Sequence, residues 1–424
     1  MTSGPFGFGL PAEDPDDQGA ARSGGTPNDP FGMFPLFGEL QKLLLGQGGP
    51  VNWELARQLA TAQLAGRAGS TPRAPGIPRA DRQQIAEAIR LADLWLDDVT
   101  TLPTGVVTTD MWTSTEWVDK TLPVWSTLCD PVAARVVAAM GTVLPEQARA
   151  QAGQLLDVLN SVGGLLFGAQ VGQALAELAD EVVSSTDVGL PLGPAGTAVL
   201  LPDNVAAFTE GLELPAEEVR LYLALREAAH HRLFGHVPWL RQRLLDTVDA
   251  YARGITVDTS AIERAMAELD PTSPESLQQA LAGGMFEPQT TPEQRSVLAR
   301  LETLLALVEG WVDTVVAQAA LGRLPGAEAL RETLRRRRAS GGPAEQTFAT
   351  LVGLELRPRR LRDAARLWQA VAERAGPAGR DAVWAHPDLL PSADDLDDPI
   401  GFAERAEADR TGVGPDDFPE LGPA

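Results

Sequence analysis

Apolar positions along the chain recur mainly at helical spacing. This pattern predicts helices at residues 81–100, 147–183, 215–234, 238–253, 259–269 and 292–321, followed by shorter helices up to about residue 375. Asp81 is placed to cap the first of them. Gly163 and Gly164 interrupt the second and indicate either a break or a point of close packing. We therefore expect a mainly helical fold.

One segment has the character of a strand. Gly196–Phe208 is the best candidate, because its β-favouring residues gather at Val199–Leu201. A threonine-rich stretch before a further helix near Pro131 predicts irregular structure and contains three tryptophans: Trp112, Trp117 and Trp125. The predicted class is therefore mainly α, an α+β arrangement with a minor sheet.

The N-terminal region differs in composition from the rest. Residues 1 to about 30 are rich in Gly, Pro and Asp and carry too little apolar surface to order themselves. We expect residues 1–80 to be largely disordered apart from an amphipathic segment at 31–45. The apolar residues of that segment are Phe31, Met33, Phe34, Leu36, Phe37, Leu40, Leu43 and Leu44. It is interpreted as packing into the main body, with docking on a partner as the alternative.

A main domain is expected at residues 81–390, since the helical pattern fills that range. The tail at 391–424 is acidic and contains Pro and Gly throughout, which predicts a flexible, loosely attached segment.

Charge and cysteine content limit the classes of function. The formal net charge of −23 makes binding to nucleic acid unexpected, because the chain repels phosphate backbones. Cys129 is the only cysteine, so no intrachain disulfide forms, which fits a reducing compartment. The N-terminus lacks the pattern of a signal peptide, and no apolar run approaches the roughly 20 residues of a membrane span. We expect a cytoplasmic protein without a membrane segment.

A basic stretch stands out against this acidic background. It comprises Arg331, Arg335–Arg338, Arg357, Arg359, Arg360, Arg362 and Arg366. Such a run either binds an acidic peptide or nucleic acid, or pairs with the acidic residues of the same chain. Internal pairing is the preferred interpretation, because charge runs are usually solvated faces.

Three of the four histidines fall in the segment LYLALREAAHHRLFGHVPWL. On a helix, Glu227 lies one turn from both His230 and His231. A zinc hydrolase needs two histidines at i and i+4 and a glutamate beside the first, which activates the bound water. Here the glutamate and the second histidine are present, but Arg226 stands where the first ligand belongs, and a guanidinium has no lone pair for a metal. The alternative is a helix whose polar residues satisfy one another.

His236 lies ten residues after Arg226, the spacing of a third ligand in one class of zinc peptidases. That class requires a glycine where this chain has Leu233, so His236 is interpreted as a loop histidine. His231 and His236 remain candidate substitute ligands.

A carboxylate interrupts the apolar segment LARLETLLALVEGWVDTVV. Glu309 is the natural candidate for a third ligand supplied by a separate downstream helix. The alternative is a solvated stripe, because Glu302, Glu309 and Asp313 fall in one narrow sector of a helix.

At these residues the sequence resembles the zincin-like metallopeptidase family, a group of bacterial zinc-dependent metalloprotease-like hydrolases. The resemblance runs from about residue 81 to residue 391 and is carried by LREAAHHRLFGHVPWLRQRLL, AYARGI, LETLLALVEGWVD, LVGLELRPRRLRDAARLW and RDAVWAHPDLLPSADDLDDP. It implies a zincin-like helical domain with Glu227 as general base and His230 and Glu309 as zinc ligands. The chain is similar to a branch with R-E-x-x-H in place of H-E-x-x-H, so Arg226 is its departure from the intact motif.

Two functions follow from this resemblance. In the first, the protein is a zinc-dependent peptidase or other hydrolase in which a substitute residue completes the metal site. In the second, it is an inactive scaffold that binds a peptide or protein, and Arg226 replaces the charge of the ion by pairing with Glu309 or Glu227. Both require Arg226, His230 and Glu309 to meet in space.

Overall fold

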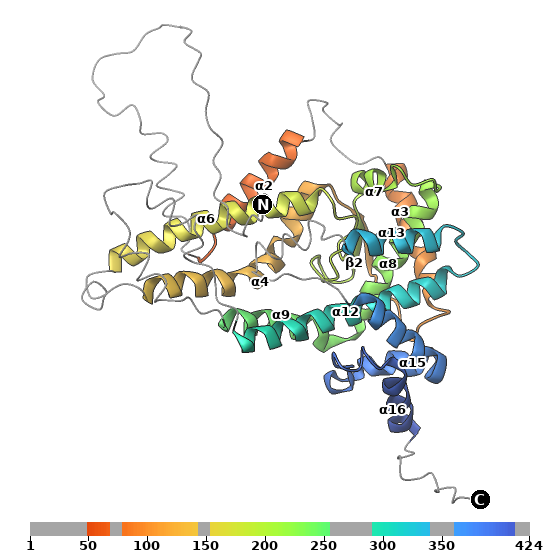
Figure 1. The fold of residues 1–424 in the computed structure, drawn as a ribbon. Helices are drawn as coiled ribbons and strands as arrows, with labels where there is room; N and C mark the ends of the chain where they lie inside the picture. Colours follow the sequence, from red (N-terminus) through yellow and green to blue (C-terminus); the bar gives the residue numbers. More distant parts are fainter. Residues whose placement is uncertain (1–48, 68–78, 143–152, 255–290, 340–359, 412–424) are drawn as a thin grey trace, which may run out of the picture.

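The computed structural model describes residues 49–67, 79–142, 153–254, 291–339 and 360–411, and most of these are helical (Figure 1). The predicted class, mainly α with a minor sheet, is confirmed. The amphipathic segment 31–45 and the helix expected at 259–269 lie outside the described residues.

Most of the predicted helices are present with similar bounds. In chain order the elements are α2 (Trp53–Arg67), α3 (Arg79–Leu96), β1 (Thr108–Met111), α4 (Ser114–Thr142), α6 (Gly153–Ala179), β2 (Thr197–Leu200), α7 (Pro202–Thr209), α8 (Ala216–His236), α9 (Pro238–Arg253), α12 (Pro292–Ala320), α13 (Ala327–Ala339), α15 (Leu361–Ala382), the 3₁₀ turns η1 (Val383–Ala385) and η2 (Pro387–Leu389), and α16 (Pro399–Thr411). Asp81 lies inside the first turn of α3 rather than capping it.

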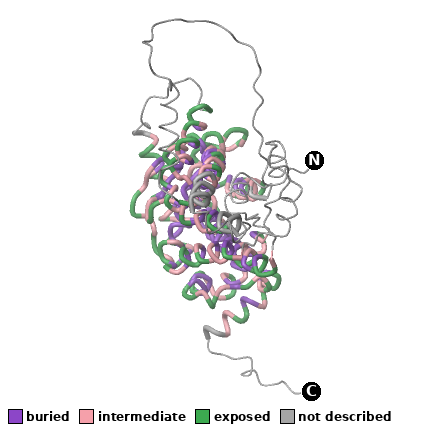
Figure 2. Tube along the Cα trace, turned by 90° about the vertical axis from the view of Figure 1, so that its left-hand side faces the viewer, coloured by how far each residue is buried: buried purple, intermediate pink, exposed green. Residues whose placement is uncertain are grey.

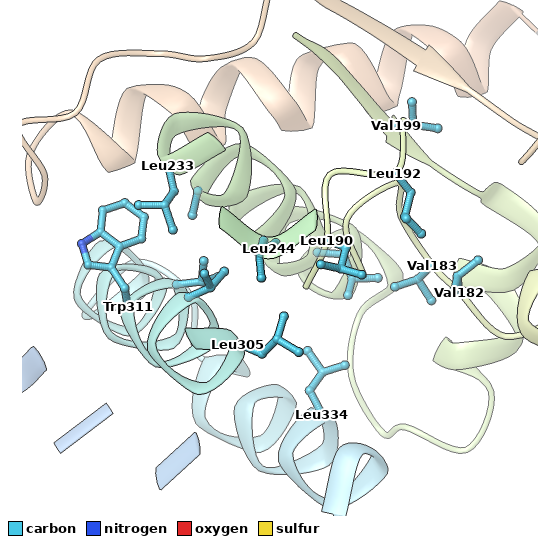
Figure 3. Packing of buried hydrophobic residues seen from close by; sticks show 14 of the residues in the cluster. Val182, Val183, Leu190, Leu192, Val199, Leu233, Leu244, Leu305, Trp311 and Leu334 are labelled. Atoms are coloured by element: carbon cyan, nitrogen blue, oxygen red, sulfur yellow. The ribbon is translucent and has the colours of Figure 1, made fainter. Parts of the chain in front are cut away.

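Helices α8 and α12 form the centre of the molecule. α12 begins with a capping box in which Thr291 and Gln294 exchange hydrogen bonds, and it is then buried on every side from Leu304 to Val316. It packs against α8, α9 and α15, and Leu305 and Trp311 point into this interior (Figure 3). By length and composition α12 is the one described helix that could cross a membrane. Most of it is buried inside the protein, as in a core helix.

Helix α6 packs closely on α2 because its facing side is made of glycines. A Cβ at Gly168 would lie 2.5 Å from the carbonyl oxygen of Asn52, and one at Gly164 would lie 3.2 Å from that of Gly49. The close-packing interpretation of the glycines in this region is therefore correct for Gly164. Helix α2 itself lies within residues 1–80, expected to be largely disordered, and is held there by burial of its small apolar face.

The expectation of irregular structure around the tryptophans holds for Trp112 but is wrong for Trp117 and Trp125. Trp117 and Trp125 belong to the long helix α4, which continues through Pro123 and Pro131. Both tryptophan side chains are completely buried. Burial of two such large side chains is worth more than the local cost of proline in a helix. Tertiary packing therefore overrides the low helix propensity of this stretch.

The sheet consists of two short parallel strands. Thr108 pairs with Thr197 and Met111 with Leu200, so the predicted strand at Val199–Leu201 is confirmed as β2. β1 is short and polar, and its sequence gave no strand pattern. Ser184 bridges to Leu200 in the antiparallel sense, so the loop after α6 runs along β2 beside α8.

The C-terminal region is more ordered than expected. Helix α15 bends at Gly376, which has φ of 71°, and α16 packs against it with Phe402 and Ala403 buried. Figure 2 shows that buried positions run through the interior of the described helices. Part of the tail expected to be loosely attached therefore contributes to the core, while residues 412–424 lie outside the described range.

Candidate functional site

Helices α8 and α12 bring together three of the predicted site residues. Nη2 of Arg226 donates to Oε2 of Glu309 at 2.6 Å, and Nε2 of His230 lies 2.9 Å from Oε1 of the same carboxylate. Arg226 and His230 are one turn apart on α8, and Glu309 faces them from α12. Arg226 is 8% exposed, His230 1% and Glu309 3%. We call this group the Arg226–His230–Glu309 centre.

Contacts on both ring nitrogens and on one ring face hold His230 in place. Its Nδ1 lies 2.9 Å from the carbonyl oxygen of Arg226, and its Nε2 faces the Glu309 carboxylate. Phe234, one turn further along α8, stacks on the ring with centroids 6.3 Å apart. Arg226 and His230 therefore contact one oxygen each of the same carboxylate.

Arg226 keeps its proton in this buried position. Burial alone would lower the pKa of its guanidinium, but the charge of Glu309, with smaller contributions from Tyr222 and Asp313, raises that pKa above its ordinary value. The site therefore contains a buried cation at position 226.

Glu227 is bonded to a different set of partners. Its carboxylate accepts hydrogen bonds from Ser185 Oγ at 2.5 Å, Thr186 Oγ1 at 2.5 Å, Thr186 N at 3.2 Å, Val199 N at 2.9 Å and His231 Nε2 at 3.2 Å. Burial would raise the pKa of Glu227, but His231 and the two hydroxyls lower it to about 2. These contacts tie α8 to β2 and to the loop that precedes it.

The two candidate substitute ligands also lie elsewhere. His231 is engaged with Glu227, and His236, the last residue of α8, lies 3.1 Å from the carbonyl oxygen of Thr104. The loop carrying Gly105 packs directly on this part of α8, since a Cβ at Gly105 would lie 1.9 Å from the His231 carbonyl oxygen. Neither histidine is bonded to Glu309 or to the other members of the centre.

The solvated-stripe alternative for α12 is wrong for two of its three residues. Glu309 and Asp313 are buried, 3% and 2% exposed. Asp313 pairs at 2.7 Å with both Arg331 and Arg335 of α13. Burial would raise the pKa of Asp313, but the hydrogen bond and charge of Arg331 hold it below its ordinary value. Two residues of the basic stretch are thus paired internally, as expected, whereas Arg357 and Arg359 lie outside the described residues.

The loop between α6 and β2 supplies contacts to the site that no sequence pattern predicts. Ser185 and Thr186 hold Glu227, and Gly189 closes over the centre, because a Cβ at Gly189 would lie 2.7 Å from Oε1 of Glu309. Gly189 has φ of 76°, a conformation that favours glycine. No sequence signal marks the two hydroxyl residues, because their role depends on how the loop folds against α8.

These residues do not fit a zinc ion as they stand. His230 and Glu309 supply two ligands, whereas catalytic zinc usually has three from the protein. The remaining position is held by a guanidinium that is already bonded to one of those ligands. The described residues contain no group of three or more His, Cys, Asp or Glu side chains that could hold a metal ion.

Comparison with known proteins gives a family and a related fold. Residues 51–403 match the family described as zincin-like metallopeptidase. Among solved structures, the chain is similar to "a putative hydrolase with a novel fold from Chloroflexus aurantiacus", with a TM-score of 0.58 and 23% sequence identity. That match covers 84% of this chain and 99% of the other. The search of curated proteins found no match.

The family match begins at residue 51, so it includes α2, and it ends within α16. Parts of the two regions expected to lie outside the main domain, residues 51–80 and 391–403, are therefore inside the matched range. The chain belongs to the zincin-like metallopeptidase family.

Proposed function

We propose that this protein is a catalytically inactive member of its family, in which an ion pair has replaced the metal, and that its scaffold binds a protein partner. The observation that carries the proposal is the bond of 2.6 Å between Arg226 and Glu309. A guanidinium cannot ligate a metal, and here it occupies the carboxylate that would have to serve as the third ligand.

The charge of the centre supports this proposal. A buried carboxylate such as Glu309 needs a nearby cation, and the Arg226 guanidinium supplies it without an ion. In this proposal the charge of Glu309 is compensated as it would be by a metal ion, but no ion is present to activate a water molecule.

The position of Glu227 supports the loss of hydrolysis. A general base must direct a lone pair at the proton it removes, within hydrogen-bond reach. The two oxygens of Glu227 already accept five hydrogen bonds from neighbouring groups. With its pKa lowered to about 2, it is also a weak base at neutral pH.

Protein binding is supported by apolar side chains exposed where α3 meets the end of α12. Leu94 is 62% exposed and Leu321 82%. Arg323 joins the two elements by pairing with Asp98 and stacking over Trp95. A contiguous apolar patch built around such side chains would be a surface for a protein partner. The sequence-based expectations of a cytoplasmic location and of no binding to nucleic acid remain predictions.

A zinc-dependent hydrolase is the second candidate, favoured by the family and by the description of the solved relative as a hydrolase. Two of the expected ligands, His230 and Glu309, are also within hydrogen-bond distance of each other. This function requires Arg226 to withdraw from Glu309 and another residue to take its place.

Metal analysis of full-length protein purified without a nickel column separates the two functions. We expect no stoichiometric zinc and no cleavage of a mixed peptide library. Zinc bound at one ion per chain, lost together with peptide cleavage in His230→Ala but retained in His236→Ala, would establish the hydrolase instead.

A further inference from the structure

Helices α8, α12 and α13 each contribute two polar side chains, spaced four residues apart, to one interior region beside the Arg226–His230–Glu309 centre. These side chains are Tyr222 and Arg226 of α8, Glu309 and Asp313 of α12, and Arg331 and Arg335 of α13. Spacing of four places the members of each pair on one face of their helix. Asp313 accepts a hydrogen bond at 2.7 Å from each arginine of α13, and Glu309 accepts one at 2.6 Å from Arg226. The polar faces of the three helices therefore meet.

Two hydrogen-bond donors in this region have no acceptor. Tyr222 is 1% exposed, and its side chain lies within electrostatic range of Arg226, Asp313 and both arginines of α13. Among the described residues, neither Tyr222 Oη nor Arg335 Nε has a hydrogen-bond partner, and neither atom is in contact with solvent. Buried polar atoms in folded proteins are rarely left unpaired, so both atoms call for a partner outside the chain.

The chemistry of these two atoms restricts what that partner is. Arg335 Nε carries a hydrogen and only donates. Burial raises the pKa of Tyr222 to about 12, so the phenol keeps its proton at neutral pH and donates as well. A partner shared by the two atoms must accept both hydrogen bonds. This excludes a metal ion or an ammonium group and leaves a water molecule or an anion.

The charges of the region favour an anion over water. Its three guanidiniums are bonded to two carboxylates, which leaves one positive charge in excess. Glu328 also pairs with Arg331, at 3.6 Å, but its side chain is 80% exposed, so solvent screens its charge. Asp187 is within electrostatic range of Arg226 and is itself paired with Arg337. An uncompensated positive charge in the interior is costly, and an anion removes that cost.

We propose that α8, α12 and α13 enclose a binding site for a monatomic anion such as chloride, held by Tyr222 Oη and Arg335 Nε. A phosphate or carboxylate group fits less well, because each of its further oxygens needs a donor of its own. The bound ion compensates the excess charge beside Arg226 and joins α13 to α8. The inference goes beyond the proposed function, and its tests involve neither zinc nor peptide cleavage.

Thermal unfolding of the full-length protein in two salts tests the site. We expect the melting temperature to rise by about 3 °C, and to level off, between about 1 and about 200 mM sodium chloride, because the ion binds the folded state alone. Sodium gluconate at the same ionic strength should give no such rise, since gluconate is too large for the site. Equal rises in the two salts would mean general screening and would overturn the proposal.

The two tyrosines of the chain supply a matched pair of variants. Tyr222→Phe removes one of the donors while keeping the ring, so we expect it to lose the response to chloride. Tyr251→Phe makes the same change on α9 and should keep the response. A chloride response that is unchanged in Y222F would contradict a site at Tyr222.

A crystal of the wild-type protein grown with sodium bromide gives a measurement that needs no variant. Bromide replaces chloride and is located by its anomalous scattering. We expect a bromide peak within hydrogen-bond distance of both Tyr222 Oη and Arg335 Nε. A water molecule at that position, or no peak there, would overturn the assignment of an anion.

Discussion

Arg226 and Glu309, 83 positions apart in the sequence, are joined by a buried bond of 2.6 Å between their side chains. His230, one turn along the same helix as Arg226, lies 2.9 Å from the other oxygen of that carboxylate. The proposal of a metal-free centre rests on these two contacts.

Arg226→His should create a zinc site. The substitution removes the cation and restores imidazoles at i and i+4, with Glu309 already in contact with His230. We expect one zinc per chain, measured by elemental analysis, and a raised melting temperature with added zinc. Arg226→Gln is the control and should bind none. Failure of R226H to bind zinc would show that the centre cannot open to admit the ion.

The same variant should remain inactive as a peptidase. The Glu227 carboxylate remains hydrogen-bonded to Ser185, Thr186 and the backbone of β2, so its lone pairs are not available to a water at the new site. We expect zinc binding by R226H without cleavage of a mixed peptide library. Cleavage that disappears on Glu227→Gln would show instead that Glu227 can turn toward the metal.

Breaking the ion pair from one side should cost more than removing both partners. Arg226→Met or Glu309→Leu alone leaves a buried charge without its partner, which typically costs about 3–5 kcal/mol of unfolding free energy. The double variant R226M/E309L removes both charges of the pair, so its unfolding free energy should be closer to that of the wild type. Urea unfolding of all four proteins gives the coupling energy as a double-mutant cycle. Additive losses would mean that the pair contributes no specific stability.

Acid should destabilise the fold in part through Glu227. Its pKa falls from the ordinary 4.5 to about 2 on folding, because hydrogen bonds from His231, Ser185 and Thr186 outweigh the effect of burial. The folded pKa is the lower one, so this contribution is fully present above about pH 5 and is lost as the pH falls toward 2. We expect Glu227→Gln to be less stable at pH 7, by up to about 3 kcal/mol, and to lose less stability between pH 6 and pH 3. Parallel pH profiles for the two proteins would contradict this assignment.

Gly189→Ala should disturb the centre itself. The backbone at Gly189 has φ of 76°, and a Cβ there would lie 2.7 Å from Oε1 of Glu309. Gly211→Ala is a matched control, since Gly211 has φ of 81° but no atom within 4 Å of its added Cβ. We expect both variants to lose about 1 kcal/mol from backbone strain and G189A to lose more, because the Glu309 carboxylate must move. Equal losses, measured by urea unfolding, would mean that the loop can shift without disturbing Glu309.

The sequence by itself determined the helical class and most of the helices of the core. Periodic apolar residues over long stretches locate α8, α9 and α12 well, because a helix buries a face that the sequence displays directly. The pairing of Glu227 with His231, and of Arg226 with His230, also follows from helical spacing. The strand β2 was recognisable for a similar reason, since its β-favouring residues stand together.

Only the tertiary structure decided what those residues do. Whether Glu309 faced solvent or Arg226 depended on how α12 packs on α8, which its own pattern leaves open because the helix is apolar on nearly all sides. The direction of Glu227 depended on a loop at residues 184–186 whose sequence carries no motif. Continuation of α4 through two prolines likewise required the burial of Trp117 and Trp125. Spacing along the sequence determines which residues share one face of a helix. The segments that pack against that face are determined only by contacts between residues far apart in the sequence.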